Sequence, residues 1–586
     1  MVKQQVEALI SEALKQLQSV GEFSAVPAFI QVDPTKDKQH GDFASNIAMI
    51  LAKAMQKNPR EVAERIVQSI PASSYVKRIE IAGPGFINFF LSADAFAQVV
   101  VKVLTEKAQY GRSDMGRGKR ILVEFLSSNP TGPLHVGHGR HAAFGMIVAN
   151  LLDAVGFKAY REYYVNDAGR QMAILGVSIW LRYLGLFGEK VVFPANGYQG
   201  EYVVDIAKRV HEEHGDCFKV PLSAVFKDLP LDEPQGGDKE IYIDAIIDRA
   251  KQLLGQDRYE ALLEVGLQNI LADIRNDLSE FGVHYDGWFS ERQLMKESVV
   301  ARVLQKLKES GHTYEREGAI WFRSTDFDDE KDRVLVRSNG QYTYFASDVA
   351  YHLNKFERGF DIAIDIFGSD HHGYLPRMRA AMQACGIHPE RLVSLLVQFV
   401  TLYRGKEQVS MSTRGGNFVT LRELREEVSN DAARFFYVMR KSEQHMDFDL
   451  ALAKSESNDN PVYYVQYAYA RISSVFKQAH ERGITYVEAQ GIDQLALLTA
   501  PQEHQLLNTI ANYPDMLVEA ALHYEPQQVT NYLRELAGDF HGYYNAYQFL
   551  IEDDKLRNAR LALVSAVRQT LLNGLNLLGI TPTESM

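Results

Sequence analysis

The chain has 586 residues, of which 46% are hydrophobic and 24% charged, as in an ordinary globular protein. These values exclude a disordered chain and a collagen-like one, and the length predicts roughly four domains of about 150 residues each. The formal net charge is −12. A nucleic acid could therefore be held only through local patches, loops or base stacking, and not by bulk charge.

The cysteine and hydropathy patterns favour an intracellular protein. Cys217 and Cys385 are too few for a disulfide framework or a structural zinc site, and their scarcity suits a reducing compartment. No run approaches the 18 or so apolar residues of a membrane-spanning helix. The N-terminal stretch is charged and helix-periodic, unlike a signal peptide. We therefore expect a soluble cytoplasmic protein that does not enter a membrane.

Residues 1–110 predict a small α+β domain. Apolar residues at helical spacing mark helices over 1–17, 43–55 and 60–70. Two β-like runs, 76–81 and 86–91, are joined by Gly83-Pro84-Gly85, which favours a hairpin. The glycine-rich, charged stretch 111–118 is the expected linker.

From residue 119 the pattern alternates between strands and helices, which predicts a parallel sheet with crossover helices. The expected strands are 121–126, 157–165, 334–337, 362–367 and 395–402, and the expected helices include 137–155 and 168–184. Residues 187–330, with a long helical pattern at 258–281, look like an insertion into this 119–455 unit. Residues 461–586 show only helical periodicity and predict a separate all-α domain.

The sharpest motif is residues 126–138, Leu-Ser-Ser-Asn-Pro-Thr-Gly-Pro-Leu-His-Val-Gly-His. It leaves a strand, passes through a loop and enters a helix, so His135 and His138 project to one face beside the free N–H groups of the helix start. Gly137, without a Cβ, would let a base or phosphate approach the backbone. These groups suit the charge of a transferring phosphoryl group. The alternatives are two solvated histidines, or a zinc pair whose remaining ligands are not found nearby.

These residues resemble a family. His135-Val136-Gly137-His138 is similar to the "HIGH" signature of class I aminoacyl-tRNA synthetases, and the loop around it resembles that of bacterial arginyl-tRNA synthetases. Five further strings agree and occur in the family's order: 41–46, 162–169, 368–374, 431–436 and 465–468.

The resemblance implies a multidomain α/β protein: a Rossmann-like catalytic core over 119–455 with its insertion, an N-terminal α+β domain that contacts the tRNA elbow, and a C-terminal helical anticodon-binding bundle. It implies an arginine–tRNA ligase that uses ATP with Mg²⁺, L-arginine and tRNA, forms AMP and pyrophosphate, and transfers arginine to the 2′ oxygen of the terminal ribose. We expect a monomer that binds no metal through its own side chains. Six tyrosines are candidates for stacking on anticodon bases or, equally, for core packing: Tyr463, Tyr464, Tyr467, Tyr543, Tyr544 and Tyr547.

The second family signature, the "KMSKS" loop, is altered here. It corresponds to residues 410–416, in which Ser410 and Thr413 replace both lysines, and Gly132 occupies the place where some arginyl enzymes carry a compensating lysine. The charge on the β,γ-phosphates is then expected from Arg414, with Arg404 and Lys406 as alternatives. The other possibility is that this loop has lost its catalytic role and only closes the site. The ATP-binding residues implied by the resemblance are Pro130, Thr131, Gly132, Pro133, Leu134, His135, Gly137, His138, Met411 and Ser412.

A guanidinium is planar and permanently charged, so its pocket should offer a carboxylate in a dry site. The resemblance implies that Tyr344 and Asp348 bracket the arginine side chain, although Asp348 could be an ordinary first-turn carboxylate. It also implies that Ser127, Asn129 and His138 hold the α-amino and carboxylate groups, and that Asp370 adds a side-chain contact. The rival functions are an HxGH nucleotidylyltransferase that uses no tRNA and a degenerate synthetase that serves as an RNA-binding module.

Overall fold

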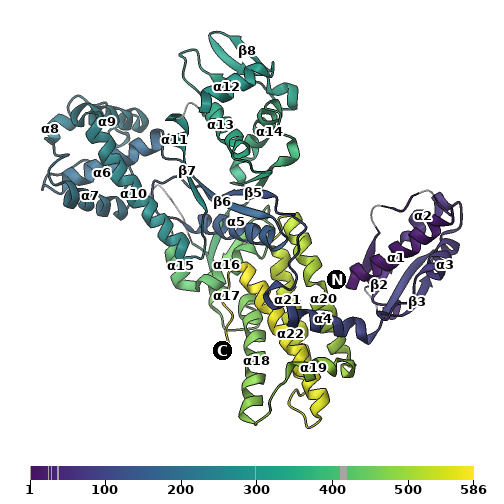
Figure 1. The fold of residues 1–586 in the computed structure, drawn as a ribbon. Helices are drawn as coiled ribbons and strands as arrows, with labels where there is room; N and C mark the ends of the chain where they lie inside the picture. The colour runs from purple at the N-terminus through teal and green to yellow at the C-terminus, as the bar shows by residue number, and fades with distance from the viewer. Residues whose placement is uncertain (1, 24, 28–29, 36–37, 297–298, 410–418) are drawn as a thin grey trace. The chain divides into compact units, whose positions relative to one another are not determined.

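The computed structural model describes the chain from residue 2 to 586, except residues 24, 28–29, 36–37, 297–298 and 410–418 (Figure 1). The chain forms two compact units. Unit 1 combines Met1–Ser113 with Ser457–His523 and Gln528–Met586, and unit 2 combines Asp114–Glu456 with Tyr524–Gln527.

A parallel sheet forms the centre of unit 2, which confirms the predicted Rossmann-like core. Its strands lie in the order β12-β11-β5-β6-β7, and each adjacent pair is parallel. Their bounds are β5 (Arg120–Phe125), β6 (Lys158–Val165), β7 (Gly287–Ser290), β11 (Ile362–Gly368) and β12 (Leu392–Val397). From β5 the chain continues to β6, toward one edge of the sheet, and from β11 it continues to β12, toward the other edge. The switch point between them is the place where open α/β sheets bind ligands.

The crossover helices cover the sheet as the strand–helix alternation predicted. They are α5 (Val136–Ala154), α6 (Arg170–Gly185), α13 (Tyr344–Glu357) and α14 (Leu375–Ala384). Most residues of α5 are buried on every side, because the helix lies between the sheet and α16 (Asn430–Val438). This explains why its sequence shows no polar stripe.

The region predicted as an insertion at 187–330 divides into two parts. The first is helical, with α7 (Glu201–His214), α8 (Leu222–Val225), α9 (Lys239–Leu254) and α10 (Gln256–Glu280) packed on α6. Between the two parts lies β7, which belongs to the core sheet. The predicted insertion was therefore too wide, because a half-buried strand of four residues is too short to show an alternating pattern.

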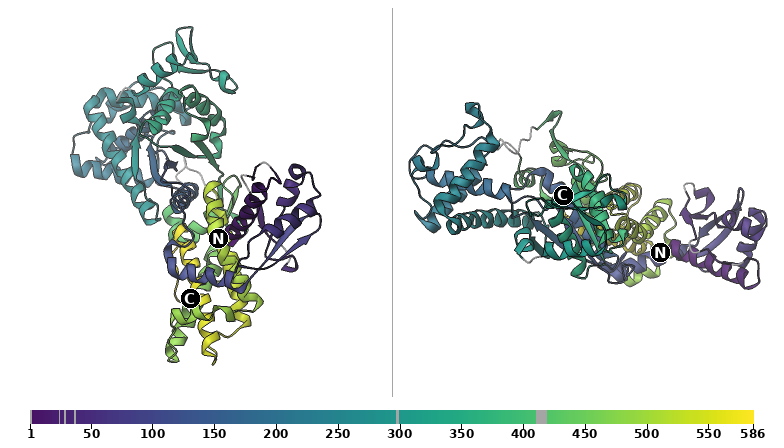
Figure 2. Two further views of the ribbon diagram at one scale, coloured as in Figure 1. Left: turned by 45° about the vertical axis from the view of Figure 1, so that its right-hand side comes forward. Right: turned by 90° about the horizontal axis from the view of Figure 1, so that it is seen from above.

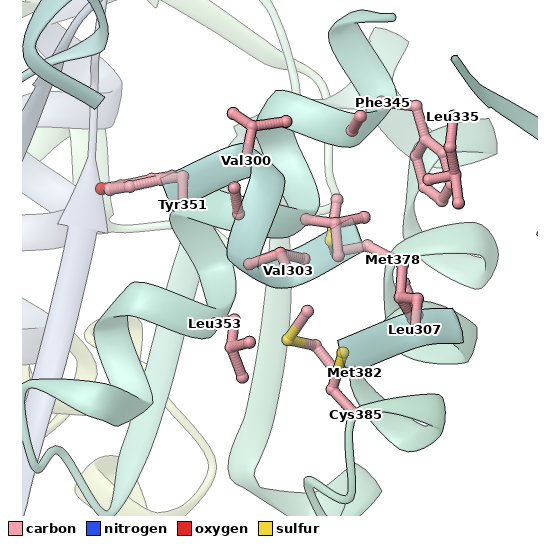
Figure 3. Packing of buried hydrophobic residues seen from close by; sticks show 14 of the residues in the cluster. Val300, Val303, Leu307, Leu335, Phe345, Tyr351, Leu353, Met378, Met382 and Cys385 are labelled. Atoms are coloured by element: carbon pink, nitrogen blue, oxygen red, sulfur yellow. The ribbon is translucent and has the colours of Figure 1, made fainter. Parts of the chain in front are cut away.

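The second part is a small module whose buried residues share one core with α13 and α14. It contains α11 (Glu291–Lys296), α12 (Val299–Glu309) and the antiparallel strands β8 (Thr313–Arg316), β9 (Ala319–Phe322) and β10 (Arg333–Val336). Figure 3 shows side chains of α12, α13 and α14, among them Val303, Leu353 and Met382, packed together. The expectation that 334–337 belongs to the parallel sheet was wrong, since β10 pairs antiparallel with β9.

The predicted strand 395–402 was also wrong as one element. It is split between β12 of the core sheet and β13 (Val400–Arg404), which pairs with β14 (Glu407–Gln408) and β15 (Met446–Asp449) in another sheet. The break lies at Gln398, where the chain leaves the core sheet. Two apolar strands only two residues apart cannot be separated by periodicity alone. The helices α15 (Leu421–Val428) and α17 (Leu450–Lys454) complete unit 2.

Unit 1 begins with an α+β part, as predicted. Its strands lie in the order β1-β2-β4-β3, and the hairpin β3–β4 is antiparallel. The predicted helix 43–55 was wrong at its start, because residues 43–45 form β2 and pair with β1 and β4. The bounds are α1 (Val2–Ser19), β1 (Val32–Pro34), β2 (Phe43–Ser45), α2 (Ile47–Met55), α3 (Pro59–Ser69), β3 (Val76–Ala82), β4 (Phe86–Leu91) and α4 (Ala93–Glu106).

The rest of unit 1 is helical, as the periodicity after residue 461 predicted. Its helices are α18 (Pro461–Glu481), α19 (Glu488–Asp493), α20 (Pro501–Leu522), α21 (Gln527–Ala546) and α22 (Asp554–Leu578). The green-to-yellow helices α18, α20 and α22 lie side by side in Figures 1 and 2. Helix α4 packs on α20 and α22, and Tyr110 donates to the carbonyl of Ile510 at 2.8 Å, so the stretch predicted to end the N-terminal domain lies against the helical bundle.

One helix among the described residues, α22, is long and apolar enough to cross a membrane by length and composition. Its sequence shows no uninterrupted apolar run, because polar residues interrupt the apolar ones. Within the structure 72% of the apolar window of α22 is buried. Helix α22 therefore forms the centre of the bundle, and its apolar surface is used in packing against α18, α19 and α20.

A row of three carboxylates crosses the middle of the core sheet. Asp365 of β11 is in register with Glu124 of β5, and Glu124 is in register with Glu162 of β6, so the three lie on neighbouring strands at about 4.8 Å spacing. All three are buried. Like charges at this separation are tolerated only when cations compensate them.

Helix α13 and its C-cap supply the compensation. Lys355 Nζ, fully buried, donates to Glu124 at 2.6 Å and to Asp365 at 2.5 Å. Arg358 donates to both oxygens of Glu162 at 2.7 and 3.0 Å. His352 lies 2.9 Å from Asp365, and the Tyr351 hydroxyl donates to Glu162 at 2.9 Å. The helix is thus fixed to three strands through its charges.

We expect Lys355→Met to destabilise unit 2 strongly, because it leaves Glu124 and Asp365 as buried charges without their cation. Breaking such a buried pair costs about 3–5 kcal/mol, or roughly 5–10 °C in melting temperature. The matched control is Lys208→Met on α7, whose partner Asp205 at 2.9 Å is exposed and contributes little. Thermal melts followed by circular dichroism measure both, and equal melting temperatures for the two variants would contradict the assignment.

Candidate functional site

The two motif histidines form the start of α5. His135 is the N-cap residue, and its Nδ1 accepts hydrogen bonds from the backbone N–H groups of Gly137 at 3.1 Å and His138 at 3.4 Å. In return, His138 Nδ1 accepts from the backbone N–H of His135 at 3.2 Å. This is a capping box in which two imidazoles replace the usual hydroxyl and carboxylate. The rings are stacked, with centroids 3.6 Å apart.

This arrangement also sets the charge and tautomer of both rings. In each ring Nδ1 accepts a hydrogen bond, so the hydrogen of the neutral imidazole is on Nε2. Burial lowers the pKa of His135 to about 4 and holds the pKa of His138 well below its usual range. Both rings therefore present neutral Nε2–H donors at pH 7. Together with the positive end of the α5 dipole, they suit a phosphoryl group.

The glycine of the motif makes room for a neighbouring ring. A Cβ on Gly137 would lie 3.0 Å from Cε1 of His135. The lack of a side chain therefore allows the His135 ring to fold back over the helix start.

The loop that leads to the motif starts with strained backbone. Leu126 has φ 70° and Ser127 has φ 40°, both in the left-handed region that costs a non-glycine residue of order 1 kcal/mol or more. The Ser127 hydroxyl donates to Glu124 at 3.1 Å and accepts from the backbone N–H of Tyr164 at 3.0 Å. The buried Tyr163 hydroxyl donates to the carbonyl of Ser128 at 2.9 Å. These bonds hold the turn in place.

A cavity of about 360 Å³ opens beside this loop. Asn129, Thr131, Gly132, Pro133, His135 and His138 line one wall. Residues of α6 and of the helical insertion, including Arg170 and Tyr202, line the other. Five of the ten residues predicted to bind ATP therefore line one cavity, whereas Leu134 is fully buried and Pro130 and Gly137 do not line it.

An acidic cluster lies at the carboxyl ends of β6 and β7. Tyr164, near the end of β6, has Glu291, Asp348, Glu124 and Asp167 close enough to raise the pKa of its hydroxyl, in addition to burial. Glu291 is hydrogen-bonded to Tyr164, and Asp348 to Tyr374. Asp167 is held by the Ser290 hydroxyl at 2.6 Å and the backbone N–H of Arg292 at 2.9 Å. Acidic side chains from three elements thus converge.

The carboxylates of this cluster are poised for a cation. Burial raises the pKa of Asp348 to about 6. Burial, followed by the charges of Asp348 and Asp167, raises the pKa of Glu291 to about 7. Carboxylates that oppose each other's ionisation gain most from a positive guest that pairs with both. A planar guanidinium with five N–H donors matches such a site.

The predicted arginine-site residues are placed as follows. Tyr344 begins α13, is 66% exposed, and has its hydroxyl near Gly169. Asp348 lies one helical turn further on, in the acidic cluster. The amide of Asn129 accepts from Asn166 at 2.9 Å and faces the cavity.

The remaining predicted contact is different. Asp370 lies in the short 3₁₀ helix Ser369–Tyr374, next to His141 of α5. Among the residues that the structure describes, it makes no hydrogen bond or ion pair with the acidic cluster. Within the described residues Asp370 is thus a neighbour of the α5 helix.

The altered signature loop lies outside the described residues, including Met411, Ser412 and Arg414. The chain that follows it pairs with the histidine loop: Val136 N–H donates to Val419 at 3.2 Å, and Leu421 N–H donates to Leu134 at 2.8 Å. Of the alternatives, Arg404 is paired with Glu427 at 2.9 Å and Lys406 is exposed. Among the described residues, no group of three or more His, Cys, Asp and Glu side chains could hold a metal ion, so the zinc alternative has no support there.

Sequence reasoning missed several residues of the site. Tyr164, Asp167 and Tyr374 lie inside strings that were recognised, but their roles depend on the meeting of β6, β7 and α13. Glu291 follows a strand too short to be predicted; a carboxylate directly after a core strand would have been the signal. Tyr202 gave no signal, since only the tertiary structure brings α7 to the loop.

Three family models match the chain. The Arginyl tRNA synthetase N terminal domain matches residues 4–91, the catalytic domain of tRNA synthetases class I (R) matches 99–192 and 245–455, and the DALR anticodon binding domain matches 465–586. The gap in the catalytic match, 193–244, covers much of the helical insertion.

Similar curated proteins and solved structures agree. The chain is 57% identical over 586 residues to the arginine–tRNA ligase of Thioalkalivibrio sulfidiphilus, covering all of both chains. It is 55% identical over 582 residues to that of Legionella pneumophila, covering 99% of each. The structure of a putative arginyl-tRNA synthetase from Campylobacter jejuni is similar with a TM-score of 0.73 at 32% identity, over 85% of this chain and 100% of that one. The arginyl-tRNA synthetase of Thermus thermophilus shares the fold over both full chains, with a TM-score of 0.75 at 22% identity.

We expect both motif histidines to remain neutral Nε2–H tautomers at pH 7. Burial and the capping box disfavour the imidazolium, so His135 should not gain a proton until the pH approaches about 4. Ring ¹⁵N chemical shifts of selectively labelled protein measure tautomer and titration together. A titration midpoint near 6.5 for His135, or a protonated Nδ1, would contradict this assignment.

Proposed function

The chain belongs to the arginyl-tRNA synthetase family, class I, and we propose that the acidic cluster and the histidine turn together activate arginine with ATP and pass it to tRNA. The observation that carries the proposal is the convergence of the carboxylates Asp348, Glu291 and Asp167 around Tyr164, at the same end of the sheet as His135 and His138. One site suits the side chain of arginine and the other the phosphates of ATP.

In the first step the arginine carboxylate attacks the α-phosphorus of ATP, the bond to the β-phosphate oxygen breaks, and arginyl-adenylate and pyrophosphate form. No protein nucleophile takes part, so catalysis is positioning and charge stabilisation. The Nε2–H groups of His135 and His138 donate to the charge that develops on the α-phosphoryl oxygens, and the positive end of the α5 dipole adds to its stabilisation. Asn129 and Ser127 orient the amino-acid end beside them.

The acidic cluster accounts for the choice of arginine. A lysine ammonium is a point charge with three donors, so it cannot pair with carboxylates on both sides as a planar fork does. Buried acceptors would be left unpaired, which costs about 1–3 kcal/mol each. Discrimination of this kind makes a separate editing site unnecessary.

In the second step a hydroxyl of the terminal ribose of the tRNA attacks the carbonyl carbon of the adenylate and AMP leaves; we assign the 2′ oxygen. The catalytic part spans 119–455, 1–110 contacts the tRNA elbow, and 461–586 reads the anticodon. Mg²⁺ enters with ATP, Arg414 supplies positive charge at the β,γ-phosphates, and the protein acts as a monomer in the cytoplasm, away from membranes.

The proposal is tested by ATP–pyrophosphate exchange with each of the twenty amino acids, with and without tRNA. We expect exchange with arginine alone, and only when tRNA is present, because a loop without its lysines needs the RNA to become competent. Exchange with another amino acid, or none with arginine and tRNA together, would overturn the proposal. Full exchange in nuclease-treated protein would refute the tRNA requirement alone.

We expect Asp348→Asn to lower kcat/KM for arginine by roughly 10²–10³-fold, because it removes one partner of a desolvated ion pair worth about 3–5 kcal/mol. Tyr344→Phe should cost less, since it removes one hydroxyl. The control is Glu357→Gln at the other end of α13, whose carboxylate is exposed and 3.7 Å from Arg302. Exchange kinetics and melting temperatures distinguish a binding role from a structural one: a large loss of melting temperature in Asp348→Asn would indicate the latter.

The raised pKa values predict that arginine binding weakens in mild acid. Asp348 and Glu291, with pKa values of about 6 and 7, pair with the guanidinium only when ionised. KM for arginine should therefore fall by roughly tenfold or more between pH 5.5 and 8, and then level off. Glu291→Gln should remove the upper part of this dependence. A KM for arginine that does not change with pH in the wild type would contradict the prediction.

A further inference from the structure

Tyr202, near the start of α7 in the helical insertion, reaches across to the histidine loop. Its hydroxyl donates to the carbonyl of Thr131 at 2.7 Å, four residues before His135. Burial raises the pKa of this hydroxyl, so it remains a donor at neutral pH. Tyr202 lines the 360 Å³ cavity and also a second cavity of about 500 Å³, whose lining residues include Pro133 and Thr420.

Two glycines make room for the Tyr202 ring. A Cβ on Gly132 would lie 3.1 Å from the Tyr202 hydroxyl oxygen and 3.2 Å from Cζ. A Cβ on Gly200 would lie 2.5 Å from Cε1 of the same ring. Neither glycine has a positive φ, so neither is required by its backbone conformation. Both sites lack a side chain where the ring lies against the loop.

The segment that carries Tyr202 is itself anchored to the core. The backbone N–H of Tyr198 donates to Ser178 of α6 at 2.9 Å, and α7 packs along α6. Since α6 follows β6 directly, the ring is connected to the same sheet that carries the histidine loop. The insertion thus supports the loop through Tyr202.

We propose that Tyr202 is a positioning residue for the nucleotide step: through the bond to Thr131 and the contact with Gly132 it fixes the loop that presents His135 and His138. This assignment rests on the proposed function and gives the helical insertion a role in it. Loss of Tyr202 lowers kcat for adenylate formation and raises KM for ATP. It raises KM for arginine less than KM for ATP, because within the part of the chain that the structure describes Tyr202 bonds to the histidine loop and not to Asp348, Glu291 or Asp167.

The test is a double-mutant cycle in the full-length protein, read by tRNA-dependent ATP–pyrophosphate exchange. Tyr202→Phe, which keeps the ring, should lower kcat about fivefold, and Tyr202→Leu about 10²-fold. Gly132→Ala should lower kcat by a similar amount in the wild type, because its methyl group clashes with the ring. In the Tyr202→Leu background the same alanine should cost less than about threefold.

The matched control is Tyr183→Phe. Tyr183 is a buried tyrosine of the same helical region whose hydroxyl also donates to a backbone carbonyl, that of Gly215 at 2.5 Å. It does not line either cavity, and we expect exchange kinetics like those of the wild type. If Tyr183→Phe lowers kcat as much as Tyr202→Phe, the effect is general destabilisation and the proposal is overturned.

Two further results decide the proposal. Independent effects of Gly132→Ala and Tyr202→Leu on kcat, or an equal rise in KM for arginine and for ATP, would overturn it. Melting temperatures of the four proteins measure the same contact without activity: the loss caused by Gly132→Ala should largely disappear when Tyr202 is leucine. If the wild type exchanges with no amino acid, the proposed function has failed, while the melting cycle still decides the contact.

Discussion

The structure of the catalytic unit depends on one buried electrostatic interaction, the row of Asp365, Glu124 and Glu162 across β11, β5 and β6. Three carboxylates in register on neighbouring strands would repel each other strongly, so the sheet is stable only with α13 in place. Lys355 and Arg358 bring the cations in well-formed hydrogen bonds. An interaction of this kind adds little net stability, but it cannot be broken on one side without a large cost. It therefore fixes the helix in one position on the sheet.

The buried network that fixes α13 also positions the acidic cluster and the histidine loop. Asp348 lies two helical turns before Lys355 on α13, so the ion pairs of Lys355 and Arg358 with the sheet determine where the acidic cluster forms. Glu124, the central carboxylate, also accepts from Ser127, the second of the two strained residues with which the histidine loop begins. The acidic cluster and the histidine loop are thus held by the same buried network, at the switch point between β5 and β11 where the two loops diverge.

The sequence predicted much of this arrangement, for reasons that particular residues show. The string around His135 combines a strand end, a proline–glycine loop and a helix start within 13 residues, and such local order is readable because each part depends on near neighbours. The parallel core followed from the alternation of strand and helix patterns after residue 119. The errors occurred where neighbours in sequence separate in space: residues 395–402 belong to two sheets, and residues 43–45 pair as a strand despite a helical pattern, since pairing with β1 and β4 on both sides overrides local preference.

The sequence by itself determined the fold class, the resemblance to the family and the histidine turn, because these depend on patterns within one or two elements; the pair Tyr344 and Asp348 follows from the resemblance and remains a prediction. Only the tertiary structure brought Glu291, Tyr164 and Tyr374 around Asp348, placed Tyr202 against Gly132, and laid the His135 ring against Gly137. Each of these contacts joins residues whose separation along the chain, from two residues to more than a hundred, leaves no periodic signal. Their meeting is decided by the packing of α7, β7 and α13 on the sheet, which no local pattern encodes.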